Sequence, residues 1–340
     1  MRTENHTLGT IYDGAGHATV AHATSIPNGR ELLSVVDDFV ASQSQFDRQA
    51  RVGIPLDALK VTQEIYLAHV RAQVMQWSDS EVAALKDIVA SLRQKFAQMT
   101  LHLPSDIYIV KTTGIEEGYA AYTRAHDTIA LPSNMVASLA SSENFGDPLH
   151  AGPSQTYLEK IVNHEMFHII SKNNPGLRHT LYGQVNYHAT GNEIVLPDVP
   201  FLLGRTLPEM KITNPDAPRL DVYIEMDVEI DGVVRKTPLV PILLSDEKYV
   251  GGTFFGALDW KFMAIEGEEG AFRPMLRNDG TPWLFDSKPL MGQYMSLVGR
   301  NITGEIFHPD EILAQSFVLI SEQPSMGLLQ TLESEIRAGG

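Results

Sequence analysis

The sequence predicts an α+β fold, in which helices and strands occupy separate stretches of the chain. Apolar residues at helical spacing fill residues 29–103, and short β-branched and aromatic runs divided by glycines follow from residue 104. Such segregation differs from the regular strand–helix alternation of parallel α/β folds. The chain has 340 residues, of which 43% are hydrophobic and 20% charged, so it can bury a sizeable core.

Residues 1–103 are predicted to form an arm followed by a helical lobe. Residues 1–28 show no apolar periodicity, which predicts an N-terminal arm that is flexible or lies on the surface. Residues 29–103 form the lobe, because apolar side chains recur at helical spacing in three stretches, residues 32–39, 59–74 and 81–96. Ser78 and Ser80 precede the third stretch as a helix start signal.

Residues 104–340 are predicted to form a second domain with a small mixed or antiparallel sheet. Two or three short strands are expected to form a meander, at residues 106–113, 119–123 and 127–132. Further on, Asp231-Gly232 has the composition of a hairpin turn between alternating strands. We interpret this hairpin, residues 218–245, as an insertion in the second domain.

Three helices complete the predicted second domain. Residues 154–172 have a start signal, helical length and a stop signal at residues 173–176. Two more helices are expected near the end of the chain, at residues 309–322 and 325–337. Pro309 suits the first position of the former, where its missing N–H costs nothing.

Composition excludes several kinds of site and partner. The chain has no cysteine, so disulfides and thiolate metal sites are excluded. A formal net charge of −16 disfavours nucleic acid, and no apolar run has the roughly 18–20 residues of a membrane span. The start of the chain lacks the apolar core of a signal peptide. The sequence does not decide the compartment, which is the cytoplasm or, if a signal peptide was removed, the periplasm or the exterior. It does not decide the oligomeric state either.

Residues 161–170, IVNHEMFHII, place three ionisable side chains in an apolar run. His164 and His168 are four residues apart, so on a helix both imidazoles lie on one face and can bind one metal ion. Glu165 lies about 100° around the helix from His164 and can reach a water on that ion. The alternative is coincidence, since a random H-E-x-x-H is expected in about 3% of such sequences. Burial favours the metal, because a buried ionisable group needs a partner.

The third metal ligand is predicted to be Glu311. Catalytic zinc usually has three protein ligands, and the third histidine of metzincins is missing because Asn174 stands in its place. Glu311 falls in the first turn of the helix expected at residues 309–322. Gln315 lies four residues on, where it can hydrogen-bond a ligand. Two alternatives remain: Glu311 only complements the helix dipole, or Glu193 is the ligand.

With H-E-x-x-H on one helix and a glutamate on a later one, the sequence resembles the gluzincin type of zinc metallopeptidase. The resemblance rests on residues 161–170 and on residues 308–317, HPDEILAQSF. It implies a zincin-like fold and Zn²⁺ bound by His164, His168 and Glu311, with Glu165 as the general base. Gln315 replaces the acidic residue that is common at its position.

The implied activity is hydrolysis of peptide bonds in a peptide or protein substrate. Zinc would acidify a water, and Glu165 would take its proton and pass it to the leaving amine. Tyr294, His308 and Tyr187 are candidate donors to the oxyanion, although His308 can equally be a helix cap or a surface residue.

Residues 126–131 are expected to form an edge strand that pairs with an extended substrate, or else an internal strand of the sheet. Two other functions stay open. The first is a zinc hydrolase acting on a non-peptide amide or ester. The second is a catalytically silent zincin-like binding module, which the presence of Glu165 disfavours because a structural zinc site needs no general base.

Overall fold

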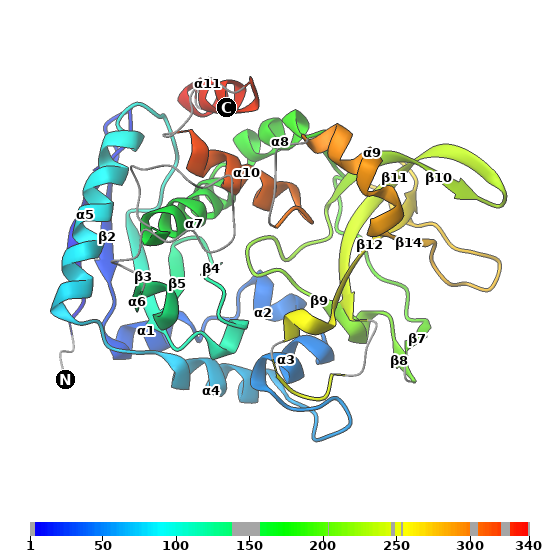
Figure 1. The fold of residues 1–340 in the computed structure, drawn as a ribbon, viewed down its shortest axis with the longest axis horizontal. Helices are drawn as coiled ribbons and strands as arrows, with labels where there is room; N and C mark the ends of the chain where they lie inside the picture. Colours follow the sequence, from blue (N-terminus) through cyan, green and yellow to red (C-terminus); the bar gives the residue numbers. More distant parts are fainter. Residues whose placement is uncertain are drawn as a thin grey trace.

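The chain folds into two groups of elements, each built around its own β-sheet. A computed structural model describes residues 4–137, 157–202, 204–245, 249–252, 254–299, 305–320 and 327–338. Figure 1 shows the first sheet with its helices on the left and the second, strongly twisted sheet on the right. The fold combines helices and strands, as the sequence predicts, but the strands form several separate sheets where one small sheet was expected.

The first sheet has five strands in the order β1-β2-β3-β5-β4. β2 and β3 are parallel, as are β3 and β5, whereas β1 and β4 run antiparallel to their neighbours at the two edges. The strands are β1 (His6–Tyr12), β2 (Ala18–Ala23), β3 (Asp106–Thr112), β4 (Tyr122–Arg124) and β5 (Thr128–Pro132).

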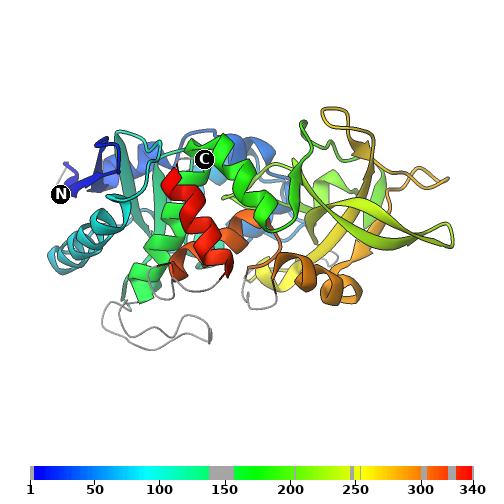
Figure 2. The same ribbon diagram turned by 90° about the horizontal axis from the view of Figure 1, so that it is seen from above.

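Helices cover both faces of this sheet, as the view from above shows (Figure 2). Successive residues of a strand point to opposite faces. Ile109 therefore packs with α5 and α7, whereas Val110 packs with α1, α2 and α4. The helices of this half are α1 (Ile26–Leu32), α2 (Asp38–Ser42), α3 (Gln45–Val52), α4 (Gln63–Gln73), α5 (Asp79–Phe96), α6 (Ser133–Ala137), α7 (Tyr157–Asn173), and the 3₁₀ turn η1 (Ile115–Glu117).

The structure corrects the predicted organisation of the first half. Residues 1–28 are not an arm, because β1 and β2 lie within them and join the first sheet. Residues 29–103 do contain helices, although residues 33–37 in the first predicted stretch are not helical, and these helices cover the two faces of that sheet and are not a separate lobe. A domain boundary between residues 103 and 104 would cut the sheet between β2 and β3. The pairing of β2 with β3, which are far apart in the sequence, places residues 1–103 in the same unit as β3. Helical periodicity contains no information about strand pairing.

The predicted meander is also wrong, because β5 lies between β3 and β4. Residues 126–131 are consequently an internal strand, the alternative left open by the sequence, and β4 is the edge. The outward N–H of Thr123 in β4 and the N–H of Ala125, directly after the strand, are already occupied. Thr123 donates to Asp216 at 2.8 Å, and Ala125 donates to Asp37 at 2.9 Å.

The second sheet is antiparallel, with the strand order β13-β12-β11-β10-β6 and two short strands paired at its side. β10 and β11 form the predicted hairpin, in which Ile230 faces Val233 across the turn. Asp231 and Gly232 both have positive φ, the conformation that an Asp-Gly turn supplies. The hairpin is not an insertion, because its two strands are the centre of this sheet.

The remaining elements of the second half are mostly short. They are β6 (Tyr187–Ala189), β7 (Pro200–Leu202), β8 (Arg205–Thr206), β9 (Lys211–Ile212), β10 (Val222–Ile230), β11 (Val233–Ser245), β12 (Leu258–Glu266), β13 (Arg273–Pro274), β14 (Leu284–Asp286), α9 (Ser287–Val298), and the 3₁₀ turns η4 (Pro208–Met210) and η5 (Phe254–Ala257). The sequence did not predict α9.

Three further helices are α8 (Pro175–Gln184), α10 (Pro309–Leu319) and α11 (Gly327–Ala338). α8 and α10 pack against α7, and α11 packs against α8 and α10. α10 lies against α7, where the rings of Phe167 and Phe317 are 5.7 Å apart. The predicted helix at residues 154–172 is α7, with residues 154–156 outside the described part. α10 begins at Pro309 as predicted, and residues 321–326 are likewise not described.

None of the helices in the described ranges is both long and apolar enough to cross a membrane.

Candidate metal centre

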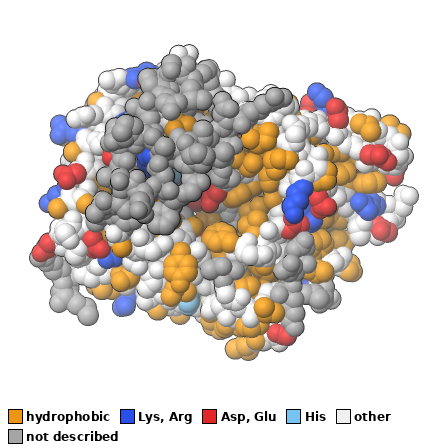
Figure 3. Space-filling view, in the orientation of Figure 1, with side chains coloured by type: hydrophobic (Ala, Val, Ile, Leu, Met, Phe, Trp, Pro, Cys, Tyr) orange, Lys and Arg blue, Asp and Glu red, His pale blue; other side chains and the backbone are white. Residues whose placement is uncertain are grey.

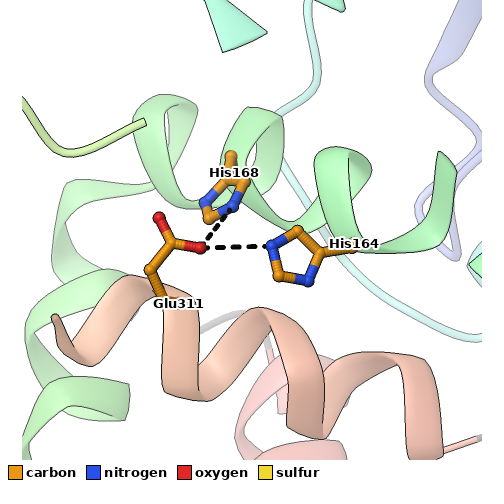
Figure 4. A group of neighbouring side chains, drawn as sticks. All are labelled: His164, His168 and Glu311. Carbon is orange, nitrogen blue, oxygen red and sulfur yellow. Dashed lines mark hydrogen bonds and ion pairs between the residues drawn. The ribbon is translucent and has the colours of Figure 1, made fainter. Parts of the chain in front are cut away.

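Two helices bring the three predicted metal ligands together. His164 and His168 lie one turn apart on α7, and Glu311 faces them from the first turn of α10 (Figure 4). Oε2 of Glu311 lies 3.2 Å from Nε2 of His164 and 3.4 Å from Nε2 of His168. Ligands of a tetrahedral zinc ion, with bonds of about 2.0–2.2 Å, lie roughly 3.3–3.5 Å apart. The three atoms can therefore hold a metal ion.

Burial of the three residues supports a ligand role. His168 and Glu311 are buried, whereas the His164 side chain is 18% exposed, so the group is open on one side. Within the described ranges, Nε2 of His168 forms no hydrogen bond. A buried polar atom without a partner is costly, and a metal ion would satisfy it.

Asp310 holds His168 in the orientation that a ligand needs. Oδ2 of Asp310 accepts a hydrogen bond of 2.6 Å from Nδ1 of His168, so Nε2 keeps the lone pair for a metal. Oδ1 of Asp310 accepts from the hydroxyls of Ser171, at 2.5 Å, and Tyr182, at 2.7 Å. Burial alone would raise the pKa of Asp310, but hydrogen bonding and charge from His168 bring it below its ordinary value.

Glu311 is oriented from the opposite side by Asn214. The Nδ2 atom of Asn214 donates to Oε1 of Glu311 at 2.7 Å, which leaves Oε2 turned toward the histidines. The charges of His168 and His164 outweigh burial and hold the pKa of Glu311 well below its ordinary value. Gln315 is buried one turn later on α10. Among the described residues it forms no hydrogen bond with the three ligands, so Asp310 and Asn214 fill the role predicted for it.

Asn214 and Asp216 belong to a segment that crosses beside α7, residues 213–216, and this segment has a buried anchor. The guanidinium of Arg51 binds Glu117 through two hydrogen bonds of 2.6 and 2.7 Å, and Asp47 at 2.6 Å. Thr213 donates from its N–H and its hydroxyl to Asp47, and its carbonyl accepts from Arg51. A fixed Thr213 in turn fixes the neighbouring Asn214.

Glu165 points toward Asp216 and His168. Oxygen atoms of Glu165 and Asp216 and a ring nitrogen of His168 lie within 4.8 Å of one another. Glu165 is buried, and its Oε2 has no hydrogen-bond partner in the described part of the chain. Burial, and then the negative charge of Asp216, raise the pKa of Glu165 well above its ordinary value, against the opposing charges of His168 and Lys172.

The two tyrosines predicted as oxyanion donors lie in the core. The hydroxyl of Tyr187 donates to that of Tyr294 at 3.1 Å, and Tyr294 donates to the carbonyl of Ile306 at 2.5 Å. Each hydroxyl has one hydrogen, and both are used. The prediction that one of them donates to a substrate is therefore wrong.

His308 is the N-cap of α10, the alternative that the sequence left open. Its Nδ1 accepts a hydrogen bond from the backbone N–H of Asp310 at 3.2 Å, so the proton of the neutral ring is on Nε2. Burial lowers the pKa of His308, against the opposing charge of Asp310, and keeps the ring neutral. Nε2 is buried and has no acceptor among the described residues. His308 is thus a cap with one free donor.

A cavity of about 560 Å³ has Lys172, Asp216 and His308 in its wall, whereas the three proposed ligands and Glu165 do not line it. This volume is within the range of ~300–1,000 Å³ that is usual for ligand pockets. On the face drawn in Figure 3, acidic side chains lie near the middle, beside a broad apolar surface. Glu193, the rival third ligand, is exposed and forms an ion pair with Arg219 at 3.4 Å.

Sequence reasoning missed Asp310, Asn214 and Asp216. Asp310 sits beside Glu311 in the first turn of a helix, where an acidic residue is explained by the helix dipole alone. Asn214 and Asp216 lie in a Pro-containing connection between β9 and β10, and such residues are typical of turns. Only their position beside α7 in the structure distinguishes Asn214 and Asp216 from ordinary turn residues.

Comparisons of the chain with protein-family models, with curated proteins and with solved structures found no match. Its chemistry is therefore inferred from the geometry of the candidate centre.

Proposed function

We propose that this chain is a zinc-dependent metallopeptidase of the gluzincin type, with a zincin-like fold. His164, His168 and Glu311 would bind the zinc ion, and Glu165 would be the general base. The observation that carries the proposal is the position of Glu311 Oε2, 3.2 and 3.4 Å from the two histidine Nε2 atoms. Asn214 and Asp310 orient the ligands from outside, as is usual for metal sites.

The residues around the centre suit hydrolysis of a carbonyl substrate. A bound zinc ion would lower the pKa of a water and polarise the substrate carbonyl. Glu165, whose Oε2 is free of other partners, takes a proton from the attacking water and delivers it to the leaving nitrogen. The free Nε2–H of His308 is the remaining candidate donor to the oxyanion.

Metal content tests the ligand assignment. We expect the purified protein to bind about one zinc ion per chain, and His168→Ala to lose it. His179→Ala is the matched control, because His179 is exposed on α8. Failure of the wild-type protein to bind zinc would favour a silent binding module.

Cleavage of a peptide library tests the reaction. The wild type should cut peptides, and Glu165→Gln should cut them about 100–10,000-fold more slowly while it retains zinc. Glu225→Gln, on the exposed face of β10, is the control for the same chemical change. Equal rates for wild type and Glu165→Gln would contradict the role of Glu165. Hydrolysis of esters or small amides without any peptide cleavage would favour the non-peptide alternative.

A further inference from the structure

The edge of the first sheet beside α7 is closed to an extended substrate. An extended peptide adds to a sheet by bonding the outward N–H and C=O groups of the edge strand. The outward N–H of Thr123 in β4 donates instead to the carboxylate of Asp216, and the N–H of Ala125, directly after the strand, donates to Asp37. Because side chains of the protein itself occupy these two N–H groups, a peptide that runs through the site cannot form backbone hydrogen bonds with Thr123 or Ala125.

Asp216 is held by one oxygen only. Its Oδ1 accepts from the N–H of Thr123 at 2.8 Å and also from the Thr123 hydroxyl. Lys172 donates to that hydroxyl at 2.6 Å and steadies it. Among the described residues none donates a hydrogen bond to Oδ2 of Asp216, and Asp216 lines the cavity of about 560 Å³. One carboxylate oxygen next to Glu165 is therefore available to a ligand.

The buried carboxylate of Glu165, whose Oε2 has no hydrogen-bond partner among the described residues, lies beside Asp216. One of its oxygen atoms belongs to the 4.8 Å group that also includes an oxygen of Asp216 and a ring nitrogen of His168. Carboxylates in such a group repel one another unless a cation or a hydrogen-bond donor lies between them. A protonated amine offers both, because it is a cation with up to three N–H donors.

We propose that Asp216 binds the free α-amino group of the substrate, so that the enzyme is an aminopeptidase. The proposal rests on the proposed metallopeptidase function. The first peptide bond would lie at the centre, and the chain end would lie against Asp216, where the closed edge of β4 admits no longer segment. Water adds its oxygen to the carbonyl carbon, the C–N bond breaks, and a proton reaches the leaving nitrogen. The products are a free amino acid and a peptide one residue shorter.

Digestion of a random hexapeptide mixture tests the proposal, with one batch free and one acetylated at the N-terminus. Mass spectrometry should show single-residue removal from the free batch and little change in the acetylated batch. Asp216→Asn keeps an acceptor for Thr123 but loses the charge. We expect it to raise KM for the free batch about 10–100-fold, the effect of one charge-assisted hydrogen bond. Asp231→Asn, in the hairpin turn, is the matched control. Internal cleavage of both batches would overturn the aminopeptidase proposal and leave the metallopeptidase intact.

A binding measurement separates the two proposals if no peptide is cut. Zinc-loaded Glu165→Gln is titrated with hexapeptides that have a fluorophore at the C-terminus, and anisotropy is recorded. Preference for the free over the acetylated peptide, lost when Asp216→Asn is added, would support Asp216 even if the metallopeptidase proposal fails. Equal binding of the two peptides, or no binding, would contradict it.

Discussion

Nδ1 of His168 on α7 donates a hydrogen bond of 2.6 Å to Oδ2 of Asp310 on α10. Glu311 follows Asp310 directly, so one turn of α10 both orients a histidine and includes the proposed carboxylate ligand. The two functions are coupled, because any shift of α10 against α7 moves both groups together.

Asp310→Asn should weaken metal binding about 10–100-fold without removing a ligand. The amide keeps the size of the carboxylate but loses the charge that fixes the His168 tautomer. Competition with a fluorescent zinc chelator measures the affinity, and Asp231→Asn is the control. Unchanged zinc affinity in Asp310→Asn would show that Asp310 does not orient the ligand.

Glu311→Gln should lose most of the bound metal, whereas Glu193→Gln should keep it. Glu311 Oε2 faces both histidines, but Glu193 is exposed and paired with Arg219. Metal content after gel filtration, measured by mass spectrometry, distinguishes the two variants. Loss of metal from Glu193→Gln alone would assign the third ligand to Glu193.

Arg51→Met should lower the free energy of unfolding by about 3–5 kcal/mol, because it leaves the buried carboxylates of Asp47 and Glu117 without their cation. Urea unfolding measures the change. Arg71→Ala, at an exposed position of α4, is the control and should cost at most about 0.5 kcal/mol. A loss below about 1 kcal/mol for Arg51→Met would mean that the carboxylates find other partners.

His308 should make the stability depend on pH. Burial lowers its pKa in the folded protein, whereas a histidine in the unfolded chain titrates at about 6.5. Below that pH the unfolded chain binds more protons, so the stability due to this group is present above about pH 6.5 and is lost as the pH falls toward the folded pKa. Urea unfolding of the metal-free protein at about pH 7.5 and 5.5 measures the slope.

His308→Gln should reduce this slope, and His179→Gln, at an exposed position, should not. Each proton of difference contributes up to about 1.4 kcal/mol per pH unit. Equal slopes in the wild type and in His308→Gln would contradict a lowered pKa.

Local signals predicted several elements well. The stop signal after Lys172 matches the end of α7 at Asn173, and Pro309 begins α10. The Asp231-Gly232 turn closes the β10–β11 hairpin. Each of these depends on a few consecutive residues, such as a proline without an N–H or an Asp-Gly pair that accepts positive φ.

Pairing between distant segments was not predictable in the same way. β1 and β2 were expected to be an arm, because their sheet partner β3 begins 83 residues after the end of β2, at Asp106. The internal position of β5 depends equally on which neighbour it pairs with. Strand order is decided by burial of side chains on both faces of the assembled sheet, and a single strand does not contain that information.

The sequence alone predicted the chemistry that we propose for the candidate centre, because two histidines and a glutamate at helical spacing on a buried helix are ionisable groups that need a partner. It also indicated Glu311 through its place in the first turn of a later helix. The tertiary structure decided which of the remaining groups act beside them. Asp310 lies beside Glu311, Asn214 and Asp216 come from one further place in the chain, and Tyr187 and Tyr294 are buried in the core. Hydrogen bonds between residues 49 to 147 positions apart depend on how the elements pack, and no local pattern contains them.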